Sequence, residues 1–124
     1  MKIEFRVWDN DNNKYFEPIY RAYKGELEEL LMQPSGKLLL RKIEKGIEAL
    51  YGESLFPDRF VVEQFTGMTN KHKQRVYVGD AIGHIDNIVE NHNGNYCING
   101  DRPLLFFFSE KVVGNRHERV AKNV

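Results

Sequence analysis

The sequence predicts an α+β fold made mainly of antiparallel strands, in which a small bent, SH3-like barrel sheet carries a two-helix insertion at residues 24–52. Segments rich in β-branched and aromatic residues lie on both sides of this insertion, and turn residues separate them at short intervals. The insertion itself is rich in Leu, Glu and Lys, with apolar residues at helical spacing. Because 124 residues suffice for one hydrophobic core, we expect residues 1–124 to form a single domain.

The first element is a predicted hairpin. Residues 3–8 alternate between apolar and polar side chains, which is typical of a strand with one buried face. The Asn- and Asp-rich residues 9–13 follow as a turn. Asp9, Asp11 and Asn13 match the first three ligand positions of an EF-hand loop, but its glycine and its final glutamate are missing. We therefore expect a turn here rather than a calcium site.

Two helices are predicted next. Residues 25–33 carry three leucines on one side and three glutamates in the first turn, where the helix dipole favours anions. Residues 37–51 carry an apolar stripe and end before Gly52, a natural residue after a helix. Such a helix pair can pack on its own sheet or contact another chain. Packing on its own core is the simpler expectation, but its place between two β blocks also suits an oligomer-forming arm, with these candidate interface residues: Leu39, Ile43, Ile47 and Leu50.

The centre of the chain predicts a second hairpin and the start of a further strand. Residues 60–65 have strand composition, and residues 76–78 resume it. Residues 69–75 between them contain no aliphatic side chain and are basic, as expected for an exposed hairpin tip. Gly79 and Asp80 form a turn before the next strand, residues 81–85.

Three blocks of the sequence resemble the YopX family of small phage and prophage proteins. Residues 5–9 (FRVWD) are similar to the family's opening F-R-A-W-D. Residues 64–68 (QFTGM) with 76–80 (VYVGD) are similar to its central Q-Y-T-G-L and I-Y-E-G-D, and residues 113–115 (VGN) with Glu118 to its closing I-G-N-I-Y-E. The resemblance implies a phage-derived protein with a β-rich, partly barrel-like fold. It brings no catalytic residues, because the family has no assigned activity.

The last third of the chain predicts short strands. Residues 91–95 contain Asn-Gly, a strong signal of a hairpin turn. Residues 104–108 (LLFFF) are apolar on both faces, so we expect a central or an interface strand. Phe106 and Phe108 are therefore further candidates for an oligomer interface.

Composition and motifs argue against most enzyme classes. The formal net charge is zero, without the basic excess typical of nucleic-acid-binding domains, and such a balance is compatible with self-association. One cysteine, Cys97, excludes an internal disulfide, and none of the four histidines stands at a metal-binding spacing such as H-x-x-x-H. No nucleophile or phosphate-loop motif occurs. We therefore predict no catalytic residue, cofactor or metal, and we expect Cys97 to be buried and inert.

The sequence thus favours a non-catalytic phage or prophage accessory protein that acts through protein–protein contacts. We expect a homo-oligomer in the cytoplasm, with no membrane association, and a host or phage protein is a further candidate partner. The alternative is a small β-barrel that binds nucleic acid through the basic hairpin, using these residues: Lys71, Lys73 and Arg75.

Overall fold

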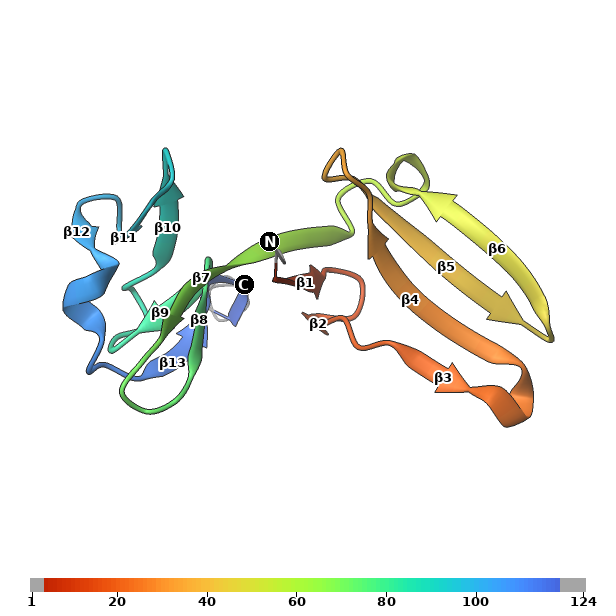
Figure 1. Cartoon of the computed structure of the whole chain (residues 1–124), viewed down its shortest axis with the longest axis horizontal. Coiled ribbons are helices and arrows are strands. Elements are labelled where there is room, and N and C mark those ends of the chain that lie inside the picture. Colours follow the sequence, from red (N-terminus) through yellow and green to blue (C-terminus); the bar gives the residue numbers. More distant parts are fainter. Residues whose placement is uncertain (1–3, 119–124) are drawn as a thin grey trace. The chain divides into compact units, whose positions relative to one another are not determined.

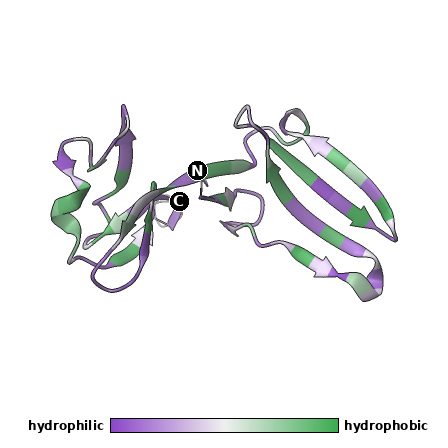
Figure 2. Ribbon diagram, viewed as in Figure 1, coloured by the Kyte–Doolittle hydropathy of each residue, from purple (hydrophilic) through white to green (hydrophobic). Residues whose placement is uncertain are grey.

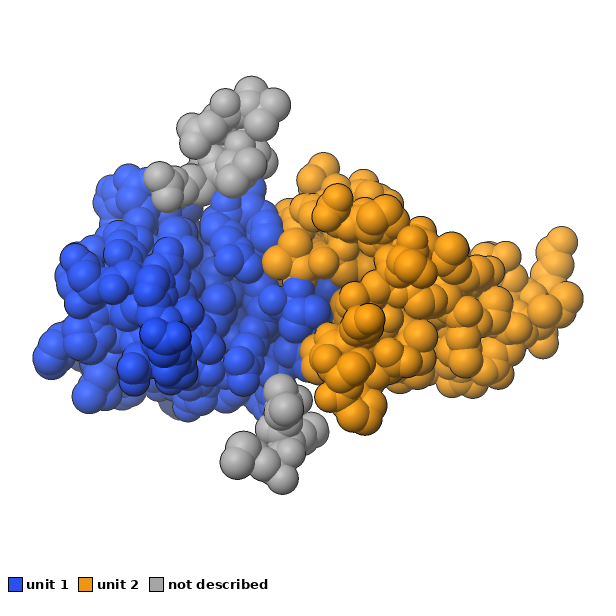
Figure 3. Space-filling view, turned by 90° about the horizontal axis from the view of Figure 1, so that it is seen from above, with its two compact units in different colours: residues 1–7, 62–124 blue, residues 8–61 orange. Residues whose placement is uncertain are grey.

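The computed structural model describes residues 4–118, so Ile3 of the first predicted strand lies outside the described residues. The chain forms two compact units (Figure 3): unit 1 comprises Met1–Val7 and Val62–Val124, and unit 2 comprises Trp8–Val61. The division falls within two strands, β1 (Phe5–Asp9) and β7 (Phe60–Thr69). That all 124 residues fold as a single domain stays a prediction.

The described chain is mostly antiparallel β, as predicted, and it includes a curled, half-barrel sheet (Figure 1). Unit 2 holds β2 (Lys14–Tyr15) and a four-stranded sheet of order β3-β4-β5-β6, with these elements: β3 (Ile19–Arg21), η1 (Ala22–Lys24), β4 (Glu26–Met32), β5 (Leu38–Glu44), β6 (Ile47–Gly52) and η2 (Glu53–Leu55). Unit 1 holds the pair β9–β13 and the sheet β10-β11-β12, with these elements: β8 (Arg75–Tyr77), β9 (Asp80–Ile82), β10 (Val89–His92), β11 (Asn95–Ile98), β12 (Arg102–Pro103), η3 (Leu104–Phe107) and β13 (Val112–Asn115).

The predicted two-helix insertion at residues 24–52 is wrong, because this stretch forms the strands β4, β5 and β6. Lys45 and Gly46 connect β5 to β6 with φ angles of 51° and 78°. Positive φ at both central residues is the signature of the type I′ turn, which suits a two-residue hairpin. The residues read as a helical stripe therefore lie on two strands that run in opposite directions.

Cross-strand pairing explains why good helix formers become strands here. Glu29 and Glu28, read as acids of a helix N-terminus, face Arg41 and Lys42 of β5 instead. Glu29 Oε1 lies 2.9 Å from Arg41 Nη1, and Glu28 Oε2 lies 4.0 Å from Lys42 Nζ. The leucines pair as well, with Leu30 opposite Leu40. Such cross-strand pairs outweigh intrinsic helix propensity, which is a weak preference.

One face of the β3–β6 sheet is covered at the end that carries Leu38, Leu40 and Tyr51, whereas Ile47 of the same face is 74% exposed. Leu38 and Leu40 are 3% and 1% exposed, and by register they share this face with Tyr51 of β6. Tyr51 packs edge-on against Phe56, which contacts Phe60 in turn. Phe56 and Phe60, which follow β6, thus supply an apolar cover for this end of the face.

The core of unit 1 is a cluster of five buried residues from several short strands and η3: Val76, Ile82, Val89, Ile98 and Leu104. The prediction of a central or interface strand at residues 104–108 is wrong. Leu104 to Phe107 form the 3₁₀ turn η3, in which Leu104 enters the core while Leu105 and Phe106 are exposed. A continuous apolar run predicts a buried strand, but in this 3₁₀ turn only some of the apolar side chains point into the core.

Three predicted turns are confirmed. Asn93 and Gly94 connect β10 to β11 with φ angles of 54° and 86°. Residues 70–74 form the tip between β7 and β8. Asp9 accepts hydrogen bonds from Asp11 N (3.0 Å) and from Arg59 Nε (3.1 Å), so its carboxylate stabilises a turn. Within residues 4–118, no helix is long and apolar enough to cross a membrane.

Candidate functional site

The second face of the β3–β6 sheet, which we call the open face, mixes exposed apolar side chains with a charged row. Hydrophobic and hydrophilic bands follow one another along these strands (Figure 2), and the register places side chains of each kind together on the open face. Tyr20, Leu50 and Leu31 are 64%, 56% and 41% exposed. The open face comprises Tyr20, Leu27, Glu29, Leu31, Leu39, Arg41, Ile43, Glu48 and Leu50.

The charged row crosses the middle of the open face from β3 to β6. Arg41 lies between two acids, with Nη1 2.9 Å from Glu29 Oε1 and Nε 3.4 Å from Glu48 Oε1. Tyr20 donates its hydroxyl proton to Glu29 Oε2 at 3.0 Å. The hydrogen bond from Arg41 lowers the pKa of the Glu29 carboxyl, and that carboxylate raises the pKa of Tyr20. The row therefore stays charged near neutral pH, with apolar side chains on both sides of it.

The four interface candidates of the predicted helices divide between two faces. Leu39, Ile43 and Leu50 lie on the open face, and the first two are half-buried. Ile47 lies on the opposite face and is 74% exposed. A helical stripe would have placed all four together, whereas the two-residue period of a strand separates Ile47 from Leu50.

The basic hairpin tip in unit 1 is built around one buried side chain. Asn70 Oδ1 accepts hydrogen bonds from His72 N and Gln74 N, both at 3.0 Å, and Asn70 Nδ2 donates to Glu110 O. Lys71 and Lys73 are exposed at the tip. The turn is therefore held in one conformation that presents both ammonium groups to solvent.

The third basic candidate is engaged elsewhere. Arg75 forms an ion pair with Glu4, and its guanidinium lies 4.1 Å from the ring centroid of Phe65. Lys71 N donates to Phe108 O at 2.9 Å, so the tip adjoins the segment after η3. Phe106 and Phe108 are 78% and 48% exposed. The structure thus brings the backbone of Phe108, one of the predicted aromatic interface residues, next to Lys71 of the predicted nucleic-acid contacts.

A buried ionic cluster, the Glu63 cluster, joins four segments of unit 1: β1, β7, β9 and residues 116–117. Glu63 is fully buried, and Arg6 Nε donates to its Oε1 at 2.9 Å. Its Oε2 lies 3.0 Å from Arg116 Nη2 and 2.9 Å from His117 Nε2. Arg6 also donates from Nη2 to Asp80 Oδ1 at 2.6 Å. These five residues connect positions 6 to 117 through side chains alone.

The acids of the Glu63 cluster are fully engaged. Both oxygens of Glu63 have partners, and Asp80 Oδ2 accepts from Tyr77 N at 2.8 Å. Burial raises the pKa of Asp80, and the amide of Tyr77 and the guanidinium of Arg6 oppose that rise. Burial lowers the pKa of His117, and Glu63 opposes that change. The geometry suits a structural clamp, because an acid–base catalyst needs a group that is available to substrate.

Only a weak signal for this cluster is present in the sequence. Glu63 is an acid on a strand face that it shares with Val61 and Phe65, and a lone acid among apolar neighbours indicates a buried partner. Its partners are 57 and 53 positions away, at Arg6 and Arg116, so no local motif contains them.

No protein-family model and no curated protein matches this chain. A solved structure is similar, the crystal structure of protein EF1440 from Enterococcus faecalis. It superposes with a TM-score of 0.58 over 97% of this chain and 96% of that one, at 16% sequence identity. At this identity the similarity shows a shared fold and nothing of function.

Proposed function

We propose that this protein acts through protein–protein contacts as a homo-oligomer, and that the open face of unit 2 is the contact surface. The observation that carries the proposal is the exposure of Tyr20, Leu31 and Leu50 beside the half-buried leucines of the same face. Exposed apolar side chains gathered on one face of a sheet are typical of an interaction site.

A second copy of the chain is the partner that this face suits best. The charged row offers both signs, with Arg41 between Glu29 and Glu48. In a two-fold interface each patch meets itself, so a row of mixed sign can pair with its own copy. Two sheet faces also pack well at about 10 Å, a distance that apolar side chains of this size fill.

We also propose that the protein is non-catalytic and of phage or prophage origin. The engaged acids of the Glu63 cluster support a structural role. The blocks that resemble the YopX family converge at Asp80, which accepts from Arg6 of the first block and pairs in register with Asn115 of the last. We extend the proposal to a cytoplasmic location, to closure of the curled sheet as an SH3-like barrel, and to a host or phage protein as a further partner.

The test compares Leu50→Gln with Ile47→Gln. Both residues are exposed and aliphatic and lie on β6, but on opposite faces. Removing one buried leucine from each side of a dimer costs roughly 3–6 kcal/mol, because each contributes about 1.5–3 kcal/mol. Sedimentation analysis should therefore show a dimer dissociated by Leu50→Gln and retained by Ile47→Gln. Equal effects of the two variants would refute the open face as the interface.

The basic hairpin tip supports a second candidate function, binding of single-stranded nucleic acid. The observation that favours it is the hydrogen bond from Lys71 N to Phe108 O, which joins the exposed lysine tip to the segment that carries the exposed Phe108. Such grouping allows phosphate contacts together with base stacking.

Salt dependence tests this second candidate. Labelled oligonucleotide binding should weaken with salt, and the double variant Lys71→Gln/Lys73→Gln should reduce the slope of log K against log salt by roughly 1.4, or 0.7 for each phosphate contact. A matched control, Lys24→Gln/Lys45→Gln, removes the same charge from exposed positions of unit 2. Equal slopes in the two double variants would exclude the tip as the binding site.

A further inference from the structure

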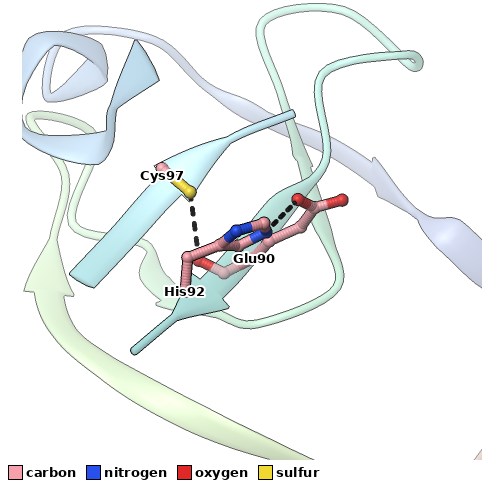
Figure 4. Close-up of side chains that lie close together, drawn as sticks. All are labelled: Glu90, His92 and Cys97. Atoms are coloured by element: carbon pink, nitrogen blue, oxygen red, sulfur yellow. Dashed lines mark hydrogen bonds and ion pairs between the residues drawn. The ribbon is translucent and has the colours of Figure 1, made fainter. Parts of the chain in front are cut away.

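The hairpin of β10 and β11 gathers three different metal-binding groups on one face (Figure 4). Glu90 and Cys97 are directly opposite in the register, and His92 follows Glu90 by two residues on the same strand. Residues two apart on a strand share a face, so all three side chains lie together. A sulfur, a nitrogen and an oxygen donor are each within 4.8 Å of the others.

The donor atoms of His92 and Glu90 already lie close together, and the thiol of Cys97 is buried beside them. His92 Nε2 lies 2.8 Å from Glu90 Oε2, and both side chains are about half exposed. Cys97 is 8% exposed, and its Sγ lies 3.9 Å from Glu90 O. The buried thiol therefore has a defined place, whereas the imidazole and the carboxylate can turn toward a bound ion.

Gly100 leaves room for the side chains of His92 and Glu90 to turn toward a bound ion. A Cβ at this position would lie 3.4 Å from His92 Cε1 and 3.6 Å from Glu90 Oε2. Any larger side chain would fill the space beside these two groups.

We propose that Glu90, His92 and Cys97 bind a zinc-class divalent cation. Thiolate, imidazole and carboxylate are the three ligand types that zinc takes in proteins. Zinc–ligand distances of about 2.0–2.3 Å place tetrahedral donors on the order of 3.5 Å apart. Donors that lie within 4.8 Å of one another must therefore approach by roughly 1.3 Å at most, whereas His92 Nε2 and Glu90 Oε2, at 2.8 Å, must move slightly apart. The thiol releases its proton to solvent on binding, and one thiolate with one carboxylate then balances the charge of the ion. Because Glu90 and His92 face solvent, the fourth position is open to water or to a ligand of another molecule.

The other histidine–acid pairs of the described chain lack one part of this arrangement. His84 Nδ1 lies 3.6 Å from Asp86 Oδ2, with the same spacing of two residues but without a thiol. His117 contacts Glu63, whose oxygens two arginines occupy. The pair of His84 and Asp86 is therefore a natural control.

The test uses the full chain without a histidine tag, freed of metal with a chelator. Co²⁺ should bind once per chain and produce a near-ultraviolet thiolate-to-cobalt charge-transfer band, and Zn²⁺ should displace it with a Kd below about 1 µM. Cys97→Ser should abolish the band. His92→Asn and Glu90→Gln should each weaken Zn²⁺ binding at least tenfold by calorimetry, and His84→Asn should leave it unchanged.

Three results would overturn the proposal: no binding by the wild-type chain, a charge-transfer band that survives Cys97→Ser, or equal Zn²⁺ affinity in His92→Asn and His84→Asn. Cys97 is buried, so its serine variant can lose stability. His92 and Glu90 are exposed, and their variants decide the outcome independently of that loss. The site lies in unit 1, outside the open face, so its failure leaves the proposed oligomer interface untouched.

Discussion

Replacing Glu63 with alanine tests the strongest energetic inference, that one buried carboxylate holds four segments of unit 1 together. Glu63→Ala removes the partner of Arg6 Nε, of the Arg116 guanidinium and of His117 Nε2. Arg6 keeps Asp80 as a partner, and the side chain of Arg116 is 38% exposed and regains water. Breaking a buried ion pair costs about 3–5 kcal/mol, and these compensations place the loss near 3 kcal/mol.

A loss of about 3 kcal/mol is a large fraction of the roughly 5–15 kcal/mol that stabilises a typical domain. For a unit of about 70 residues it lowers Tm by roughly 12–24 °C. Urea unfolding followed by circular dichroism measures the change in the free energy of unfolding. Hydrogen exchange shows which unit is destabilised, because the Ile82 amide reports on unit 1 and the Leu40 amide on unit 2.

Asp101→Ala is the matched control, because it removes an acid of unit 1 that is exposed and lies 3.7 Å from its cation, Arg102. Such a surface change alters stability by no more than about 0.5 kcal/mol. The clamp interpretation is refuted if Glu63→Ala stays as stable as Asp101→Ala, or if its loss appears at Leu40 rather than at Ile82.

Two further predictions concern the same cluster. Gly79→Ala should destabilise the protein by at least about 2 kcal/mol in urea unfolding, because φ is +95° and the new Cβ would lie 2.3 Å from Glu63 Oε2. Gly94→Ala is its control, because φ is similar at +86° but nothing lies within 4 Å of the new Cβ, and it should lose less stability. Wild-type stability should fall as pH decreases from about 6.5 toward the lowered pKa of His117, since the unfolded chain then binds more protons. His117→Gln should flatten that slope, and an unchanged slope would contradict the assignment. Asp80, whose pKa is raised, acts in the opposite sense in the window that extends upward from about 3.8.

The parts of the fold that depend on local turn chemistry could be predicted from the sequence. Asn93 and Gly94 form a tight turn in any context, because both tolerate positive φ. Asp9 likewise bonds to the backbone that follows it. These signals lie within a few residues of the structure that they determine.

The β4–β6 region could not be predicted from the same signals, because two periodicities compete there. Leu39, Ile43, Ile47 and Leu50 fit a helix, and the Lys45-Gly46 turn that breaks this pattern is a weak signal beside strong helix formers. The acids of β4 find Arg41 and Lys42 only after the strands have paired. Tertiary pairing therefore decides the structure of this region.

The candidate sites show the same limit. Spacing along the chain does not reveal that Cys97 stands opposite Glu90, because that relation depends on the register of a hairpin. The Glu63 cluster depends on contacts across more than 50 positions. Phe106 and Leu50 were predicted as interface residues and both are exposed, although the elements predicted to carry them, a strand and a helix, were wrong.

The solution mass of the wild-type chain tests the proposed function most directly. Light scattering on a sizing column, over a range of protein and salt concentrations, should give a stable multiple of 14.6 kDa that Leu50→Gln reduces to a single chain. A mass of 14.6 kDa for the wild-type protein at every concentration would contradict the proposal that the open face joins two copies.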